Sequence, residues 1–279
     1  ESLNIPPFGH VIDYMTYGGI YRDVYLEVRN QVYLKDVFVR SEFTSKRDAV
    51  LISEAELNEE TQGYVVRQSM RKKGETQSVL LGECKAEAVT KLSFPVKNVS
   101  LWDVEQPALY EIKTELVWQG RVLDEAVTVF GFREAQFRRD GFYLNGRKLK
   151  IRGLNRHQCF PYVGYAMPEA MQKRDADLLK RELGVNAVRT SHYPQSHYFL
   201  DRCDELGLLV FTELPGWQHI GDAAWKEQAV ENVRDMVRQY RNHPSVILWG
   251  VRINESQDDD GFYAETNRVA RSLDPSRQT

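Results

Sequence analysis

The sequence predicts two kinds of fold in succession, a β-sandwich followed by an α/β region. Over the first half of the chain, short β-forming segments alternate with turns about every 8–12 residues, which is typical of a sandwich. Near residue 132 the pattern changes, and from Lys150 onward short apolar strands alternate with amphipathic helices. This alternation indicates parallel strands joined by crossover helices.

The β-forming segments of the first half are separated by polar residues or glycine. Residues 110–118 alternate most strictly between apolar and polar side chains, and a turn at Gln119 and Gly120 follows them. The segment 71–75 is charged and contains a glycine, so we expect a solvated turn there and not a binding patch. We expect strands at residues 21–28, 32–38, 49–57, 63–69, 80–87, 88–96, 110–118 and 122–130.

In the second half, Asn145 and Gly146 separate two short β-forming segments and predict a two-residue hairpin. Gly184 and Gly207 each follow a helical segment and are expected to end it. We expect helices at residues 168–183, 195–206, 223–240 and 262–273, and β/α units that begin at Lys150, Val185, Leu208 and Ser245. Such units form either a small open sheet or the first half of an eight-stranded barrel, and the pattern alone leaves both open.

Composition excludes several classes of protein. The 279 residues carry a formal net charge of -3, so no basic surface for nucleic acid is expected. No apolar run approaches the roughly 18 residues of a membrane span. Cys84, Cys159 and Cys203 have no metal-binding spacing, and their scatter favours a reducing compartment such as the cytoplasm, although the compartment stays open. The chain begins without a methionine or a signal peptide, so we expect an internal piece of a longer protein.

The most informative feature is the Asn254–Glu255 pair, which follows the apolar run from Val246 to Trp249. In barrels and open α/β sheets, catalytic groups lie at the carboxyl ends of the strands. A carboxyl group beside an amide suits general acid/base work on a hydroxylated substrate. The alternative is that this pair caps the next helix. The acidic residues 258–260 fit a solvated turn before that helix.

The other three strands of the second half are also followed by polar side chains. Any one of these loops is weak evidence, but together they predict one polar cleft at the mouth of the sheet. The candidate site residues are Asn155 and His157 after the first strand, Arg189 and His192 at the second, Glu213 and Trp217 at the third, and Asn254 and Glu255 after the fourth.

These strand-end blocks resemble glycoside hydrolase family two. Residues 186–194, continuing to 203–207, are similar to the first signature of the family, and residues 242–255 are similar to the second. Residues 151–157 also fit the family pattern. Together the three blocks span most of residues 150–255.

The front of the chain resembles the same family. Residues 17–26 resemble the last strand of its N-terminal sugar-binding jelly roll, and residues 101–110 and 130–133 resemble its immunoglobulin-like middle domain. The resemblance implies a multidomain β and α/β chain with an immunoglobulin-like β-sandwich and half of a TIM barrel. The implied domains are a jelly-roll remnant at 1–28, the sandwich at 29–132, and the N-terminal half of the (β/α)8 barrel at 133–279.

The resemblance implies a retaining β-glycosidase, most similar to β-galactosidases, with β-glucuronidase specificity as the alternative. By family position, Glu255 is the general acid/base, and Asn254 holds the sugar 2-hydroxyl. Arg189 is expected to pair with the nucleophile, while His157 and His192 hold sugar hydroxyls or stabilise the transition state. The remaining substrate contacts are expected from Asn155 and Trp217, and Glu213 is expected to bond to an arginine or histidine of the site.

Two departures from the family pattern concern selectivity and catalysis. Gln158 and Cys159 stand where bacterial β-galactosidases often carry Glu and His, which leaves sugar selectivity open. The family nucleophile is a Glu beyond the acid/base, and no residue after Glu255 matches it. We therefore expect this chain to be inactive by itself.

The expected partner is a β-linked carbohydrate, and a homo-oligomer is compatible with the open edge of a half barrel. No cofactor or metal is expected, because no equivalent of the family's magnesium ligands is found after the third strand. The alternative from another class is a non-catalytic carbohydrate-binding or interaction module, in which the same loops bind sugar or another chain without turnover.

Overall fold

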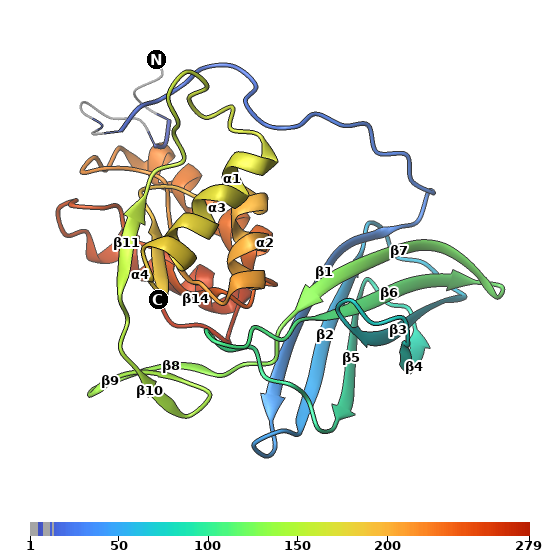
Figure 1. Cartoon of the computed structure of the whole chain (residues 1–279). Helices are drawn as coiled ribbons and strands as arrows, with labels where there is room; N and C mark the ends of the chain where they lie inside the picture. Colours follow the sequence, from blue (N-terminus) through green and yellow to red (C-terminus); the bar gives the residue numbers. More distant parts are fainter. Residues whose placement is uncertain (1–4, 8–11, 13) are drawn as a thin grey trace. The chain divides into compact units, whose positions relative to one another are not determined.

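The structure is a computed structural model that describes residues 5–7, 12 and 14–279. The chain divides into two compact units (Figure 1). The sandwich unit consists of residues 24–134, and the barrel unit combines residues 135–279 with the segment that ends at Asp23. Along the described parts of the chain, no helix has both the length and the apolar character that a membrane span requires.

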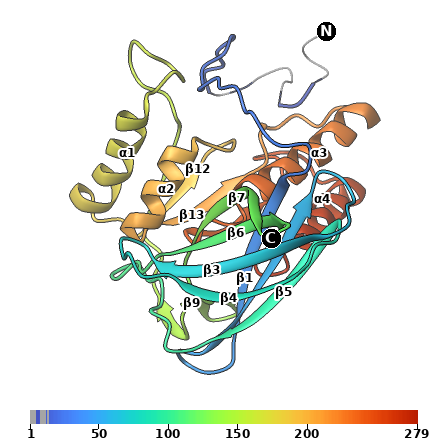
Figure 2. The same ribbon diagram turned by 90° about the vertical axis from the view of Figure 1, so that its right-hand side faces the viewer.

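The sandwich unit contains two antiparallel sheets (Figure 2). One sheet has the order β1 (Leu34–Phe43), β2 (Ala49–Leu57) and β5 (Val89–Val96), and the other has the order β4 (Val79–Lys85), β3 (Tyr64–Lys72), β6 (Tyr110–Trp118) and β7 (Arg121–Phe130). Burial alternates along β2, as the sequence pattern predicts for a strand with one face on a core. Leu51 of one sheet and Val66, Ile112 and Leu116 of the other are fully buried between them.

A polar row crosses this core. Ser53 Oγ donates to Gln68 Oε1 at 2.7 Å, and Gln68 Nε2 donates to Thr114 Oγ1 at 2.9 Å. All three side chains are fully buried. Because each group finds a partner, the row links β2 to β3 and β6 without leaving these polar atoms unsatisfied.

The prediction of a strand at residues 21–28 is wrong. These residues pair with no strand in the described chain, and Val24, Leu26 and Val28 are exposed. A strand needs a neighbour to satisfy its backbone N–H and C=O groups, and alternating side chains do not supply one.

The solvated turn expected at residues 71–75 is present, and the Glu75 N–H donates to the Lys72 carbonyl at 3.0 Å.

A small antiparallel sheet begins the second part of the barrel unit. It consists of β8 (Ala135–Arg138), β9 (Gly141–Leu144) and β10 (Arg147–Leu149). The predicted hairpin at Asn145 and Gly146 is confirmed, with φ of 53° and 74°, the left-handed values that a type I′ turn requires. The sequence did not indicate β8, because its four residues are only partly buried and carry little alternation.

Four parallel strands follow, in the sheet order β11 (Gly153–Arg156), β12 (Ala187–Thr190), β13 (Leu209–Glu213) and β14 (Val246–Gly250). The order in the sheet is the order in the chain. A doubly wound sheet would reverse direction at a switch point, whereas a barrel adds each strand beside the last. The strand order therefore selects the half-barrel over the small open sheet.

The helices pack on one face of this sheet (Figure 1). They are α1 (Glu169–Asp177), which continues as a π-helix (Leu178–Glu182), then α2 (His197–Leu206), α3 (Ala223–Tyr240) and α4 (Asp260–Leu273). Gly184 and Gly207 follow α1 with its π-helical turn and α2 in the left-handed conformation, each with φ of 67°, as predicted. Asp259 caps α4 by accepting from the Phe262 N–H. The turn expected at residues 258–260 is not found, because Asp260 is already the first residue of this helix.

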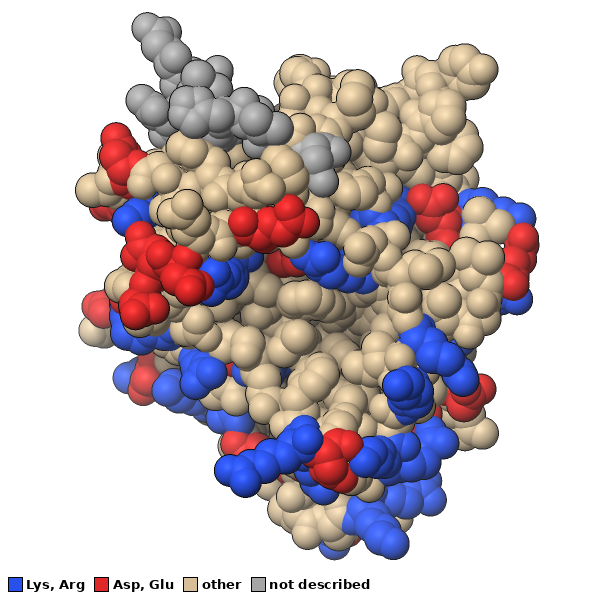
Figure 3. Space-filling view, turned by 90° about the vertical axis from the view of Figure 1, so that its left-hand side faces the viewer, with Lys and Arg blue, Asp and Glu red and all other residues tan. Residues whose placement is uncertain are grey.

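The opposite face of the sheet is hollow. A cavity of about 280 Å³ lies there, and Leu209, Phe211 and Leu248 are among the apolar residues that line it. Figure 3 looks onto the side of the molecule on which β11 lies, where charged residues of both signs surround a hollow formed mainly by uncharged residues.

Candidate active site

The carboxyl ends of the four parallel strands bring the predicted site residues together. Because parallel strands point the same way, the ends of β11, β12, β13 and β14 lie at one edge of the sheet. Asn155, Arg189 and Glu213 lie within the strands close to these ends, and the other candidates follow directly. The site is thus assembled by the strand register.

Arg189 links three of the strand ends. Its Nε donates to Glu213 Oε2 at 2.9 Å, and a terminal guanidinium nitrogen donates to Asn254 Oδ1 at 2.8 Å. The Arg189 side chain is 27% exposed, whereas that of Glu213 is 4% exposed. A buried carboxylate requires such charged and hydrogen-bonded partners, so Glu213 and Arg189 fix one another.

His192 binds the second oxygen of the same carboxyl group. Its Nδ1 lies 2.9 Å from Glu213 Oε1. A terminal guanidinium nitrogen of Arg189 lies 3.3 Å from the same Nδ1, so the His192 ring is held between the Glu213 carboxyl group and the Arg189 guanidinium. The expectation that Glu213 bonds to an arginine or histidine of the site matches this geometry.

Gly250 makes room for Glu213 at the end of β14. A Cβ atom at position 250 would lie 2.5 Å from Glu213 Cβ and 2.8 Å from Phe211 Cε2. Atoms of real side chains do not approach so closely, so another residue here would push β13 and β14 apart. The glycine that follows Trp249 therefore determines how closely Glu213 approaches its partners.

Asn254 is held with one amide atom engaged and the other available. Its Oδ1 accepts from Arg189, while its Nδ2 is buried and has no hydrogen-bond partner among the described residues. The backbone is also held, because the Gln218 N–H donates to the Asn254 carbonyl at 2.8 Å. A buried donor without a partner costs about 1–3 kcal/mol, and a ligand oxygen would recover it.

Glu255 projects from the same loop toward solvent. It is exposed, and its backbone φ of 54° is in the left-handed region, which residues other than glycine adopt rarely and often at functional sites. Gln218 Nε2 donates to Glu255 Oε2 at 3.2 Å. The Asn254–Glu255 pair is not the cap of α4, because Asp259 occupies that position.

The remaining candidates lie around this centre. The His157 and His192 rings are 5.4 Å apart between centroids, and His157 Nδ1 lies 3.4 Å from the Tyr193 hydroxyl. Asn155 is exposed on β11, in register with Arg189. Trp217 forms a bridge with Asn254, and its Nε1 is buried without a partner among the described residues.

Sequence reasoning missed two residues that contact this group. Gln218, which bonds to Glu255, follows Trp217 in a loop and carries no pattern that would mark it. Tyr14, whose ring lies 5.8 Å from His157 and 6.1 Å from His192, precedes both by more than half of the chain. Only the tertiary structure brings these residues to the strand ends.

A possible metal-binding group lies away from these residues. In the described parts of the chain, Asp201, Asp204 and His243 offer ligand atoms within 4.8 Å of one another. His243 Nδ1 lies 2.6 Å from Asp204 Oδ2, and the other oxygen of Asp204 accepts from the Ser245 N–H at 2.9 Å. This pairing accounts for the cluster as a link between α2 and the loop before β14.

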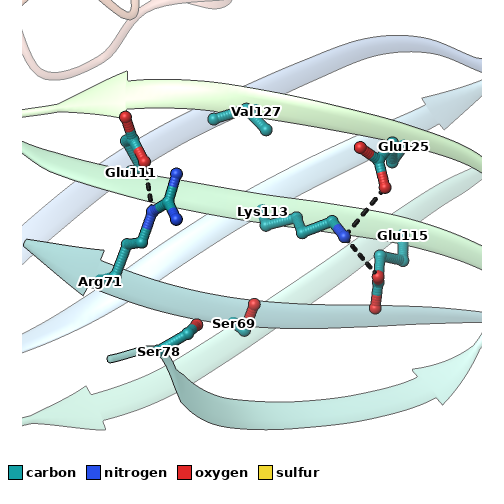
Figure 4. Close-up of a pocket in the computed structure, with 8 residues that line it drawn as sticks. All are labelled: Ser69, Arg71, Ser78, Glu111, Lys113, Glu115, Glu125 and Val127. Carbon is teal, nitrogen blue, oxygen red and sulfur yellow. Dashed lines mark hydrogen bonds and ion pairs between the residues drawn. The ribbon is translucent and has the colours of Figure 1, made fainter. Parts of the chain in front are cut away.

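The sandwich unit has a hollow of its own, about 420 Å³ in volume, on its four-stranded sheet (Figure 4). Its charged side chains pair with one another. Arg71 bonds to Glu111, and Lys113 Nζ lies 2.8 Å from Glu115 and 2.9 Å from Glu125. Such mutual pairing describes a solvated sheet surface and not a charged binding site.

Family models match nearly the whole of both units. The model described as "Glycosyl hydrolases family 2, TIM barrel domain" matches residues 136–279, which is more than half of the chain. The chain belongs to glycoside hydrolase family 2. A second model, described as "Glycosyl hydrolases family 2", matches residues 32–133. The family expected from the strand-end motifs is therefore confirmed, and so is the sandwich followed by a partial TIM barrel.

Curated relatives include two bacterial β-galactosidases. The chain is 51% identical to that of Thermoanaerobacterium thermosulfurigenes over 288 aligned positions, covering 100% of this chain and 40% of the relative. It is 47% identical to that of Thermoanaerobacter pseudethanolicus, covering 100% of this chain and 38% of the relative. The chain thus spans about 40% of the length of the curated relatives it matches.

Solved structures of similar fold include β-glucuronidases. The Bacteroides uniformis β-glucuronidase 2 covalently bound to cyclophellitol-6-carboxylate aziridine matches with a TM-score of 0.83 and 28% identity, covering 99% of this chain and 37% of that one. The Parabacteroides merdae β-glucuronidase with glycerol in its active site matches with a TM-score of 0.84 and 31% identity, covering 99% and 36%.

Proposed function

We propose that this chain carries the acid/base half of the active site of a retaining β-glycosidase of β-galactosidase type. The observation that supports the proposal most strongly is the Asn254–Glu255 pair. It stands at the end of β14, with Asn254 anchored by Arg189 and its amide Nδ2 left for a ligand. Glu255 is exposed beside it, where a substrate can reach the carboxyl group.

In this proposal Glu255 protonates the glycosidic oxygen as the aglycone leaves, and then accepts a proton from the water that hydrolyses the glycosyl-enzyme. Asn254 Nδ2 donates to the sugar 2-hydroxyl, an interaction that strengthens in the transition state. Arg189 holds Asn254 in place through Oδ1. Glu213 in turn orients Arg189 and His192, because one of its carboxyl oxygens binds each side chain.

Sugar hydroxyls are the proposed ligands of His157, His192 and Asn155, and Trp217 is proposed to contact the substrate through its buried Nε1–H. The nucleophile is proposed to be a carboxylate outside this sequence. A retaining mechanism places it about 5–5.5 Å from the acid/base, where it forms the covalent intermediate. A related β-glucuronidase is covalently bound to an aziridine, which is compatible with such chemistry in the family. Arg189, whose carboxylate partner within this chain is Glu213, would also face that nucleophile.

The domain organisation of this proposal places a jelly-roll remnant at 1–28, the immunoglobulin-like sandwich at 29–132 and the half barrel at 133–279. β-Galactosidase specificity is favoured by the identities of 51% and 47% to curated β-galactosidases. β-Glucuronidase specificity is the second candidate, because the similar solved structures include β-glucuronidases, at 28% and 31% identity.

The test is the hydrolysis of nitrophenyl β-galactoside and nitrophenyl β-glucuronide, by this chain and by the longer enzyme that we expect to contain it. The longer enzyme should cleave the galactoside faster, and the chain alone should cleave neither, because a retaining enzyme without its nucleophile loses the covalent route. Robust hydrolysis by the chain alone would contradict the missing nucleophile. Sugar binding without turnover by the longer protein would favour a non-catalytic binding module.

A further inference from the structure

The loops that follow β13 and β14 run side by side beyond the ends of the two strands. Trp217 forms a parallel bridge with Asn254, and the Gln218 N–H donates to the Asn254 carbonyl at 2.8 Å. These contacts extend the pairing of the strands into the loops. The backbone therefore makes Gln218 and Glu255 neighbours, each one residue beyond the bridge.

The loop that carries Gln218 is held on two sides. The Gly216 N–H donates to the His192 carbonyl at 3.1 Å. On the other side the loop packs against Ile253, since a Cβ atom at position 216 would lie 2.7 Å from Ile253 Cδ1. The side chain of Gln218 thus starts from a backbone whose position is fixed.

Gln218 and Glu255 share an uncommon backbone conformation. Their φ angles are 58° and 54°, in the left-handed region that residues other than glycine adopt rarely. Such a conformation persists where the surrounding structure holds it in place. From these two positions the side chains meet, and Gln218 Nε2 donates to Glu255 Oε2 at 3.2 Å.

This amide is the partner of the Glu255 carboxyl group. Among the residues that the structure describes, no other side chain bonds to that group, and no cation pairs with it. Arg252, three residues earlier, instead donates to Asp258 Oδ1 at 2.6 Å and to the Ser256 carbonyl at 3.1 Å. A cation would favour the charged carboxylate, whereas an acid/base takes up and releases a proton in every cycle.

The amide distinguishes the two carboxyl oxygens. An amide N–H can only donate, so the oxygen that it contacts serves as an acceptor. In a protonated carboxyl group the carbonyl oxygen is the better acceptor and the other oxygen carries the proton. The contact with Gln218 therefore favours Oε2 as the carbonyl oxygen and leaves the proton on Oε1 of Glu255.

We infer that Gln218 is a positioning residue for the acid/base, holding Oε2 of Glu255 so that Oε1 exchanges the proton. Oε1 gives its proton to the glycosidic oxygen as the bond to the anomeric carbon breaks. It receives one from the water that attacks the anomeric carbon, so no net proton is consumed. The inference rests on the proposed function for the role of Glu255, and Gln218 itself touches no reacting atom.

The experiment measures kcat/KM of the longer enzyme, which reports glycosylation, for methyl β-galactoside and dinitrophenyl β-galactoside. Gln218→Met keeps the length of the side chain and removes the donor. It should lower the value for the methyl galactoside about tenfold, a part of what a general acid contributes, and that for the dinitrophenyl galactoside less than about twofold. Gln218→Asn accepts the left-handed backbone but is one methylene shorter, so it should show the same selective loss.

Two controls separate positioning from a general disturbance of the loops. Arg252→Gln alters the loop of Glu255 without removing the donor, so it should affect both substrates equally and little. If Gln218 acts through Glu255, Gln218→Met should cause no further loss on the methyl galactoside in the Glu255→Gln background.

Equal losses on both substrates in Gln218→Met, or unchanged values in Gln218→Met and Gln218→Asn, would overturn the inference. The contact itself is tested in this chain, where the side-chain amide 1H–15N signals of Gln218 should shift in Glu255→Ala and stay in place in Arg252→Gln. Signals that do not shift in Glu255→Ala would also overturn it. If they shift but the longer enzyme hydrolyses no galactoside, the contact is supported and the proposed function is the part that fails.

Discussion

Glu213 determines the geometry of the site at the scale of single residues. Its carboxyl group is nearly inaccessible to solvent, and its two oxygens bind Arg189 and His192. Since Arg189 in turn holds Asn254, the orientation of the amide proposed to contact the sugar depends on Glu213. A residue that touches no substrate in this account still controls those that do.

We predict that Glu213→Ala lowers the free energy of unfolding by about 3 kcal/mol, because it leaves the charge of Arg189 partly buried without its partner. Urea unfolding of the chain measures the change. Glu265→Ala is the matched control, since Glu265 pairs with Arg268 at the surface of α4 and such pairs contribute little. If both substitutions changed the free energy of unfolding equally, the contacts of Glu213 with Arg189 and His192 would contribute no more to stability than a surface ion pair.

At this scale the sequence placed the candidate residues at the ends of neighbouring strands, and the structure brings them to one edge of the sheet. The family resemblance implied that Glu213 bonds to an arginine or histidine of the site, and its contacts with Arg189 and His192 match this expectation. Gln218 and Tyr14 could not be found in this way. Their proximity to Glu255 and to the histidines is created by loop conformation and long-range docking, which leave no periodic signal.

At the scale of elements, the close approach of β13 and β14 depends on Gly250. We predict that Gly250→Ala destabilises the chain by about 1–3 kcal/mol, the cost of overpacking, and displaces Glu213. Gly261→Ala, in the exposed first turn of α4 with only ordinary contact at 3.9 Å, should instead stabilise it by up to about 1 kcal/mol. Thermal unfolding of both variants tests the contrast, and a neutral Gly250→Ala would refute the packing argument.

The link between α2 and the loop before β14 should depend on pH. Burial by itself lowers the pKa of His243, but the charge of Asp204 and the hydrogen bond to it outweigh burial and raise the pKa above its usual 6.5. Asp201 also raises this pKa, and Arg277 opposes the increase. His197 Nδ1 lies 3.5 Å from His243 Nε2. A raised pKa in the folded state stabilises below about 6.5 and loses this contribution as pH rises through the folded value.

The difference in unfolding free energy between the wild type and His243→Gln should therefore be largest below about pH 6.5 and should shrink at higher pH. Urea unfolding from pH 5.5 to pH 9 measures it. A difference that grows as pH rises would contradict the raised pKa of His243.

Helices and hairpins whose ends are marked by cap or turn residues were predictable from the sequence. Gly184 and Gly207 end helices, Asn145 and Gly146 form the hairpin, and α3 has the bounds that its amphipathic pattern gives. The strand expected at residues 21–28 failed because alternation indicates a suitable surface but not the presence of a neighbouring strand. The register shift between Val210 and Phe211 on β13 was equally invisible, since it depends on the pairing with β14.

At the scale of the whole molecule, the sequence pattern fitted both a small open sheet and the first half of an eight-stranded barrel. The order of the strands in the sheet selects the half-barrel. Sequential addition of β11 to β14 belongs to a barrel, and the family model for a TIM barrel domain matches the same region. The chain corresponds to about 40% of a related β-galactosidase, and we propose that Glu255 works with a nucleophile carried by another part of the longer protein.

The most direct test of that central claim is the dependence of Glu255→Gln on the leaving group, measured as kcat/KM in the longer enzyme for a series of β-galactosides. Loss of a general acid should cost about 10²–10⁴-fold for alkyl galactosides, whose leaving groups need a proton. Dinitrophenyl galactoside needs little assistance and should lose much less in its glycosylation step. Equal losses across the series would contradict the acid/base role of Glu255.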